Sequence, residues 1–258
     1  MLRAFGEAFH GLPLLLLALI IFVSGYLIAG VIFIAVAKIA KKRETPTGLV
    51  TSLLSPLGTI FGLLAVFIMA QVWDGVTRAE AALEREASAL RMIVLLAGGF
   101  PPEIEAKLKT LVRIHIDEIV RIEWPAMAQH AATLEFAPLA LADALKIALA
   151  FSPVNEGQIT AQREIVTVIE TALDARRQRI ILSQGRVDPV KWTCLFVQAT
   201  VMLVAIAFLH SKDRTGAWIA LTLFVTGVSV SVLLIVSHDL PFTGELAIKP
   251  DVLRQVRP

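Results

Sequence analysis

Charged residues are scarce in this chain of 258 residues. They make up 18% of it, against about a quarter in an ordinary soluble domain, while 56% of the residues are hydrophobic. Lysine and arginine (24) barely outnumber aspartate and glutamate (22), and no long basic run is interleaved with aromatic residues, so nothing supports nucleic-acid binding. The composition predicts a membrane protein.

Cysteine and catalytic motifs are also lacking. Cys194 is the single cysteine, so a disulfide within the chain is excluded and a cysteine metal site is not expected. The sequence contains no GxSxG, no HExxH and no Walker lysine motif, and its long apolar runs contain no paired carboxylates. We therefore expect no enzymatic activity, no catalytic residue, no cofactor and no metal site.

Long apolar runs are what the chain has instead. Each of four runs is long enough to cross a bilayer as a helix. They are Leu12–Ala37, Leu49–Trp73, Val190–Leu209 and Gly216–Val236. Ala35 and Ala37 also form the A-x-A pattern of a signal-peptide cleavage site, but the first run far exceeds the about 7–15 apolar residues of such a peptide, which favours a membrane anchor.

The first eleven residues, MLRAFGEAFHG, precede this anchor. Leu2, Phe5 and Phe9 lie at helical spacing opposite Arg3 and Glu7, a pattern typical of a short amphipathic helix in the lipid headgroup region. A frayed terminus is the equally supported alternative.

The region 74–189 has no spanning run but a clear helical period. Apolar residues recur every three or four positions, and Gly and Pro pairs divide the region into four predicted helices. Trp124-Pro125 is expected to close the second, while the third is expected at Pro138–Ala150 and the fourth at about Gln158–Leu182. The predicted fold is thus an all-α membrane protein with a soluble helical domain inserted between the second and third spans.

The domain organisation follows from these runs. Residues 1–73 hold the N-terminal segment and the first two spans, 74–189 the soluble helical domain and 190–237 the third and fourth spans. Residues 238–258 form a polar tail that is expected to dock on the helical domain as an extended arm.

The second span is unusual because small and polar residues interrupt it. Pro56 removes one backbone hydrogen bond and predicts a kink, near which Gly62 adds freedom. Ser55 and Thr59 share one face one turn apart. From the residues alone this face either packs closely against another helix or lines a wet pathway.

Two residues of the helical domain are open to a functional and a structural interpretation. His115 lies on an apolar face without a second histidine or cysteine at metal spacing, which favours a core histidine over a metal ligand. Trp124, before Pro125, is either a buried residue at a helix end, which we favour, or the anchor of a subunit contact.

A basic group lies near the end of the last predicted domain helix. Arg176, Arg177 and Arg179 are candidates for a ring that attracts anions in an inner vestibule. A solvated face near the membrane, or pairing with Asp174 and Glu170, is the favoured alternative.

Four ordered motifs resemble the bacterial bestrophin-like membrane family. They are FGLLAVFIMAQVWDGVTRAEAALEREASALR at Phe61–Arg91, EWPAMA at Glu123–Ala128, LDARRQRI at Leu173–Ile180 and HDLPFTG at His238–Gly244. More distantly, Pro56, Gly62 and Trp73 are similar in order and spacing to the second span of the bestrophin ion channels.

This resemblance implies a homopentamer with an ion pore lined by the second span. The neck positions would be Ser55, Thr59 and Leu63, which lie at i, i+4 and i+8 and hence on one helix face. Bestrophin necks carry large apolar residues at all three positions. The hydroxyl groups of Ser55 and Thr59 therefore argue against a neck that closes by excluding water, as an apolar constriction does. In the animal channels an acidic calcium clasp follows the corresponding motif, whereas after Gly244 this chain has only Glu245 and Asp251 as acidic residues, so calcium gating is not expected.

The sequence therefore favours an oligomeric ion channel whose partners are other copies of the chain, the lipid bilayer and small inorganic ions. The alternative is a non-conducting scaffold or sensor whose helical domain binds a partner protein. Following the resemblance, we expect the bacterial inner (plasma) membrane with the helical domain in the cytoplasm, although the basic residues of the two short turns favour the opposite orientation.

Overall fold

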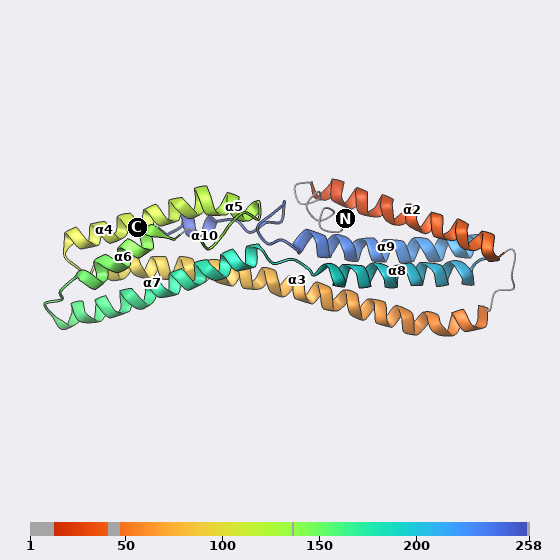
Figure 1. Cartoon of the computed structure of the whole chain (residues 1–258), viewed down its shortest axis with the longest axis horizontal. Coiled ribbons are helices and arrows are strands. Elements are labelled where there is room, and N and C mark those ends of the chain that lie inside the picture. The colour runs from red at the N-terminus through yellow and green to blue at the C-terminus, as the bar shows by residue number, and fades with distance from the viewer. Residues whose placement is uncertain (1–12, 41–46, 136, 257–258) are drawn as a thin grey trace. The chain divides into compact units, whose positions relative to one another are not determined.

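The computed structural model describes residues 13–40, 47–135 and 137–256, with no side chains described for 47–49. Within those ranges every regular element is a helix (Figure 1). The chain divides into two compact units. The first unit comprises Met1–Asp74 and Arg186–Asp239, and the second comprises Gly75–Gly185 and Leu240–Pro258. The predicted amphipathic helix at residues 1–11 lies outside the described residues.

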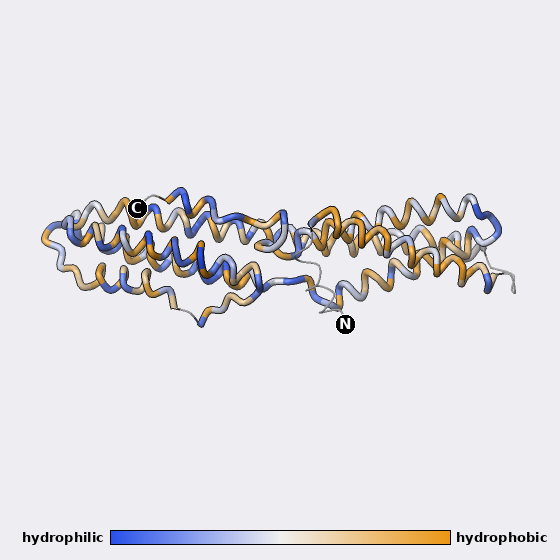
Figure 2. The backbone as a smooth tube through the Cα atoms, turned by 90° about the horizontal axis from the view of Figure 1, so that it is seen from above, coloured by the Kyte–Doolittle hydropathy of each residue, from blue (hydrophilic) through white to orange (hydrophobic). Residues whose placement is uncertain are grey.

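The helices of the first unit confirm the four predicted apolar spans. They are α2 (Leu14–Ala40), the first part of α3 (Thr47–Ala97), α8 (Pro189–Leu209) and α9 (Arg214–His238). All four are long and apolar enough to cross a membrane, and Figure 2 shows their largely hydrophobic colouring. At the start of α8, the Asp188 side chain accepts a hydrogen bond from the Val190 N–H, and Pro189 occupies the first turn.

Helix α2 packs closely against α9 at one glycine. A Cβ atom added at Gly25 would lie 3.0 Å from the Ser229 Oγ and 3.2 Å from the Val225 side chain. One residue further along, the Tyr26 and Thr226 hydroxyls lie within a hydrogen bond of 2.8 Å. In an apolar helix pair, a small residue at the crossing lets such polar groups reach each other.

Substitution of Gly25 tests this crossing. We expect Gly25→Val to destabilise the first unit by about 1–3 kcal/mol, because the new side chain overpacks the contact with Ser229. Gly30→Val, on the same helix, is the matched control, since a Cβ there meets nothing within 4 Å. The melting temperatures of the two purified variants in one detergent are the measurement, and equal values would contradict the close crossing.

The second unit contains the four predicted helices of the domain region. They are the second part of α3, α4 (Pro102–Glu118), α6 (Leu139–Ala150) and α7 (Glu156–Ser183). Along these helices hydrophobic and hydrophilic residues alternate (Figure 2), and the apolar faces meet in one buried core that includes Leu90, Ile93, Leu108, Leu141 and Ile165. Asn155 caps α7, because its side chain accepts the Gln158 N–H at 2.8 Å.

The prediction that Trp124-Pro125 closes the second domain helix is wrong. After α4 the chain forms a π-helical turn, η1 (Ile119–Glu123), and continues as α5 (Trp124–Ala128). In a regular helix the Pro125 ring would clash with the carbonyl four residues earlier. A wider turn immediately before the proline relieves that clash, so the helix passes through it.

The tail after α9 packs on the second unit. Phe242 is buried in a cluster with Ala79, Met127 and Ile180, and Thr243 Oγ1 donates to the Ala128 carbonyl at 3.1 Å. The tail ends in a short helix, α10 (Asp251–Arg254), so it is not extended throughout.

Candidate functional site

The predicted neck residues lie on the outer side of α3 in the first unit. Ser55, Thr59 and Leu63 are all exposed, whereas Ile68 and Val72, which occupy the other side of the helix, are buried in the core of this unit. Leu63 keeps 55% of its surface exposed. The face is therefore available to lipid, to another copy of the chain or to a pore.

The hydroxyl of Thr59 is bonded to its own helix. Thr59 Oγ1 donates to the Ser55 carbonyl at 3.1 Å, so its outward side presents only oxygen lone pairs. Helix α3 runs without interruption through Pro56 and Gly62, and the kink expected there stays a prediction.

A set of polar contacts closes the first unit where α9 ends. The Asp239 carboxylate accepts the Val187 N–H at 2.8 Å, Lys191 donates to Gln71, and the Trp73 and His238 rings stack with centroids 6.2 Å apart. Burial raises the pKa of Asp239, because the charged form loses solvation. Aromatic and basic residues of this kind are typical of a membrane interface.

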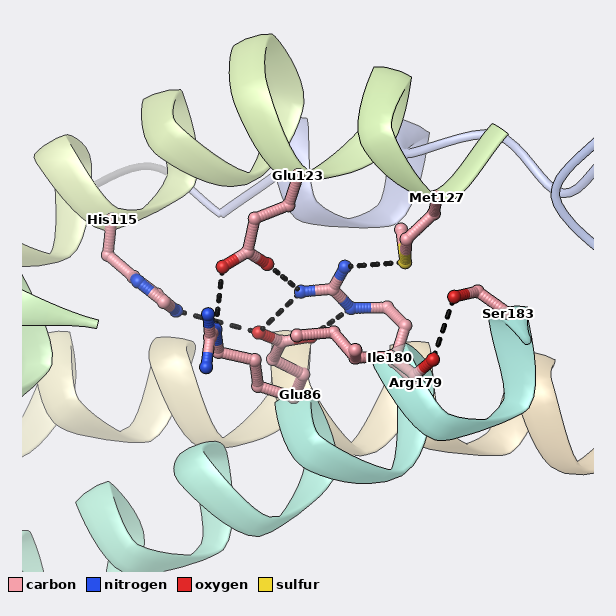
Figure 3. A network of polar contacts seen from close by, with 8 residues as sticks. Glu86, His115, Glu123, Met127, Arg179, Ile180 and Ser183 are labelled. Carbon is pink, nitrogen blue, oxygen red and sulfur yellow. Dashed lines mark hydrogen bonds and ion pairs between the residues drawn. The ribbon is translucent and has the colours of Figure 1, made fainter. Parts of the chain in front are cut away.

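The strongest polar cluster lies in the second unit and links α3 with α7 (Figure 3). The Arg179 Nε donates to Glu86 Oε2 at 2.7 Å, and its Nη2 lies 3.2 Å from Glu86 Oε1. Neither side chain is exposed to solvent. A buried ion pair of this geometry retains both charges because each neutralises the other.

Glu123, at the end of the π-helical turn, extends this cluster. Its Oε2 accepts from Arg179 Nη2 at 2.8 Å and its Oε1 from Arg176 Nε at 2.6 Å. The Arg179 guanidinium also lies 3.3 Å from the Met127 sulfur and 5.6 Å from the centre of the Trp124 ring. Two carboxylates thus face two guanidinium groups, and their charges balance.

His115 completes the cluster from α4. It is 1% exposed, and its Nε2 lies 3.5 Å from Glu86 Oε1. Neither ring nitrogen forms a hydrogen bond in the part of the chain that the structure describes. His115 is therefore a core residue, as predicted, although its polar atoms are not satisfied by hydrogen bonds.

The pKa values follow from these contacts. Burial by itself raises the pKa of the Glu86 carboxyl, but the adjacent Arg179 charge outweighs burial, and the pKa falls from 4.5 to about 2. Burial likewise lowers the pKa of Arg179, yet Glu86 and Glu123 raise it above its ordinary value. The ion pair thus remains charged throughout the physiological pH range.

A pH dependence of stability follows from the low pKa of Glu86. Because the folded pKa lies below the unfolded one, the stability that Glu86 contributes is present above about pH 4.5 and is lost as the pH falls toward about 2. Glu86→Gln removes this titration, so we expect its unfolding free energy to depend less on pH in that window than that of the unmodified chain. Thermal unfolding at a series of pH values is the measurement. The exposed Glu164→Gln is the control, and a slope for Glu86→Gln equal to that of the control would contradict the assignment.

The structure places the other sequence candidates as follows. Arg176 is 5% exposed, so a solvated face is the wrong description of it, and its Nε partner is Glu123. Arg177, the next residue, is exposed. Trp124 is half-buried and packs edge-on against Phe242, with ring centroids 5.3 Å apart.

Sequence reasoning missed Glu86, the acid at the centre of the cluster. A signal was present, because Glu86 lies at helical spacing from the apolar residues Ala79, Leu83 and Leu90, all of which are buried. A lone acid on an apolar face predicts a buried partner. Which residue that partner is depends on α7, which lies far along the sequence.

Across the described residues no group of three or more His, Cys, Asp and Glu side chains is placed to hold a metal ion. The buried cluster is closed and charge-balanced, so it suits holding helices together rather than binding a ligand. The exposed face of α3 is the better candidate for function.

Comparison with known proteins points in the same direction. The bestrophin-like domain family matches residues 14–253. The fold is similar to the crystal structure of a bacterial bestrophin homolog from Klebsiella pneumoniae that carries a tryptophan-to-alanine mutation, with a TM-score of 0.62 and 14% sequence identity over 92% of this chain and 94% of that chain. A search of curated proteins found no significant match.

Proposed function

Because the chain belongs to the bestrophin-like family, we propose that this membrane protein is an oligomeric channel that conducts small inorganic ions along a central axis. The observation that carries the proposal is the exposed face of α3. Ser55 and Thr59 place hydroxyls on the exposed side of the largely apolar first part of α3, where they suit water and ions better than lipid.

In the proposed assembly α3 of each subunit faces the axis. Ser55, Thr59 and Leu63 line the pore, and Pro56 and Gly62 set the local bend of the helix. We propose a homopentamer for two reasons. The chain matches the bestrophin-like family, and the resemblance to bestrophin channels implies five subunits. Its second span also has a long exposed face that other subunits could contact. If two copies met face to face on this side of the helix, no path would remain along the axis, whereas a ring of several copies leaves a central path.

The proposed placement assigns the second unit to the solvent. Its residues 75–185 lie in the chain between the apolar first part of α3 and the apolar helix α8, so we describe it as a soluble domain inserted between spans. We place it in the cytoplasm and the apolar helices in a bacterial inner membrane. Exposed Arg177 is proposed to lie at a subunit contact, while buried Arg176 and half-buried Trp124 serve the fold of the domain.

Planar bilayers containing the purified full chain test the proposal. We expect discrete current steps under a voltage or salt gradient and a single oligomer by native mass spectrometry. A silent bilayer combined with a monomeric or dimeric particle would overturn the channel and favour the scaffold that binds a partner protein. Silence from a cyclic oligomer would also count against conduction as its function.

A further inference from the structure

His115 is a buried histidine whose ring nitrogens have no hydrogen-bond partner in the described part of the chain. Its Nε2 points toward Glu86 (Figure 3), but 3.5 Å separate it from Glu86 Oε1, which is longer than an ordinary N–H···O bond. Buried polar atoms in folded proteins are nearly always bonded. A neutral imidazole in this place keeps one nitrogen lone pair uncommitted, and that lone pair can accept a proton.

The charged side chains of the cluster around His115 come from three neighbouring elements. Glu86 belongs to α3, Glu123 to η1, and Arg176 and Arg179 to α7. While the imidazole is neutral, two carboxylates and two guanidinium groups leave no net charge. A proton on His115 adds a fifth, unbalanced charge to this interior, where an uncompensated charge is costly.

The remaining charges near His115 are accessible to solvent. Glu118, one turn later on α4 itself, keeps part of its surface exposed. Helices α6 and α10, which share the core of the second unit, carry only exposed charged residues, and these form pairs within each helix. The pairs are Asp143–Lys146 at 2.9 Å and Asp251–Arg254 at 3.7 Å. Water screens such exposed charges, so the four side chains of the cluster dominate the charge balance at His115.

A protonated His115 competes with Arg179 for one oxygen atom. Glu86 Oε1 lies 3.2 Å from Arg179 Nη2 and 3.5 Å from His115 Nε2. The contact at 3.2 Å is the longest of the three that Arg179 makes with carboxylate oxygens, since the other two measure 2.7 and 2.8 Å. An imidazolium attracts this oxygen and repels the guanidinium. Protonation therefore weakens the longest Arg179 contact first.

Arg179 links this competition to the π-helical turn. Its Nη2 also donates to Glu123 Oε2, and Glu123 is the last residue of η1. Turns of this kind are rare and frequently occur at functional sites. Pro125, two residues later, has no backbone N–H to donate. The segment 119–128 therefore depends on the side-chain contacts of Glu123 as well as on its own backbone.

We propose that His115 is a proton-sensitive switch inside the second unit, whose protonation weakens the hold of Arg179 on Glu123 and loosens residues 119–128. Histidine is the side chain that ordinarily changes its charge between about pH 5 and 8. Over that range both arginines keep their charge, and so does Glu86, whose pKa is about 2. The segment is thus tightly held at the upper end of the range and loosens as the pH falls through it.

Hydrogen–deuterium exchange of the purified full chain in detergent, at about pH 7.5 and about pH 5.5, tests the switch. The readout is the protection of the peptide that covers residues 119–128, corrected for the dependence of intrinsic amide exchange on pH. We expect this protection to fall about tenfold on acidification, as the loss of one charge-assisted hydrogen bond would cause. Peptides from α6 are expected to keep their protection.

Two variants of His115 and one control show which group takes up the proton. His115→Gln and His115→Leu replace the imidazole with side chains of similar size that do not titrate, and both are expected to lose the response. His130→Asn is the matched control, because His130 is the other histidine of the second unit and asparagine tolerates its φ of 55°. This variant is expected to keep the response of the unmodified protein.

Unchanged or increased protection of residues 119–128 at the lower pH in the unmodified protein overturns the proposal, whatever the variants do. A response that persists in the His115 variants overturns it as well, since the proton then acts through another group. Loss of the response in His130→Asn has the same consequence. A response that disappears in the His115 variants and remains in His130→Asn supports the switch.

Discussion

Replacing Arg179 with leucine is expected to lower the unfolding free energy of the second unit by about 3–5 kcal/mol. The arginine has no exposed surface and binds the carboxylates of Glu86 and Glu123. Its removal leaves Glu86 buried without its closest cation, and a buried unpaired charge is far more costly than a missing surface contact. Thermal or chemical unfolding of the purified full chain, followed by circular dichroism, measures the loss.

Neighbouring variants show whether the loss comes from the ion pair. Arg177→Leu removes an exposed cation two residues away and is expected to change stability by no more than about 0.5 kcal/mol. A Glu86→Leu, Arg179→Leu double variant is expected to be more stable than Arg179→Leu alone, because it removes the stranded carboxylate as well as its partner. If Arg179→Leu unfolded like Arg177→Leu, the cluster would contribute little to the fold.

Replacing Thr59 with phenylalanine is expected to abolish measurable current through the proposed channel. The new ring would stand at a neck position whose present side chain is exposed and carries a hydroxyl. Repeated around a symmetry axis, bulky apolar rings narrow the path and exclude water, and a dewetted constriction stops ions. Single-channel recording in planar bilayers, at matched protein density, is the measurement.

A second phenylalanine variant shows whether position or bulk matters. Leu223 lies on α9 within an apolar span and is 70% exposed, so Leu223→Phe adds comparable bulk away from the proposed axis. It is expected to conduct like the unmodified protein. Unchanged current in the Thr59 variant, or equal loss in both, would remove Thr59 from the pore lining.

The buried cluster fixes the rotation of the second part of α3 within the second unit. Glu86 and Glu84 lie two residues apart on one helix, yet one is buried and the other exposed. The Arg179 guanidinium fixes Glu86 on the inner side. The same contact therefore leaves Glu80 and Glu84 on the outer side of this part of α3.

Local signals in the sequence were sufficient for the helices. Unbroken apolar runs predicted the four spans, and the three- and four-residue period predicted the helices that became α4, α6 and α7. Capping followed the same local rules, as at Asn155. Each of these features depends on residues within one or two turns, so a single sequence is enough to find it.

The helix end predicted at Trp124-Pro125 is the place where reasoning from neighbouring residues gave the wrong result. Proline predicted a helix end, but the π-helical turn before it allowed the helix to continue. The surroundings stabilise that turn, because Glu123 binds two arginines and Trp124 packs on Phe242 of the tail. Tertiary contacts thus overrode a local preference.

By itself, the sequence determined that this is an all-helical chain with four apolar spans, and its motifs carried the resemblance to the bestrophin-like family. Only the tertiary structure decided which charges pair. Arg176 and Arg179 stand beside Asp174 in the sequence, yet their carboxylate partners Glu86 and Glu123 lie on other helices. Helical period is a property of neighbouring residues, whereas the partner of a buried charge is set by how distant helices pack.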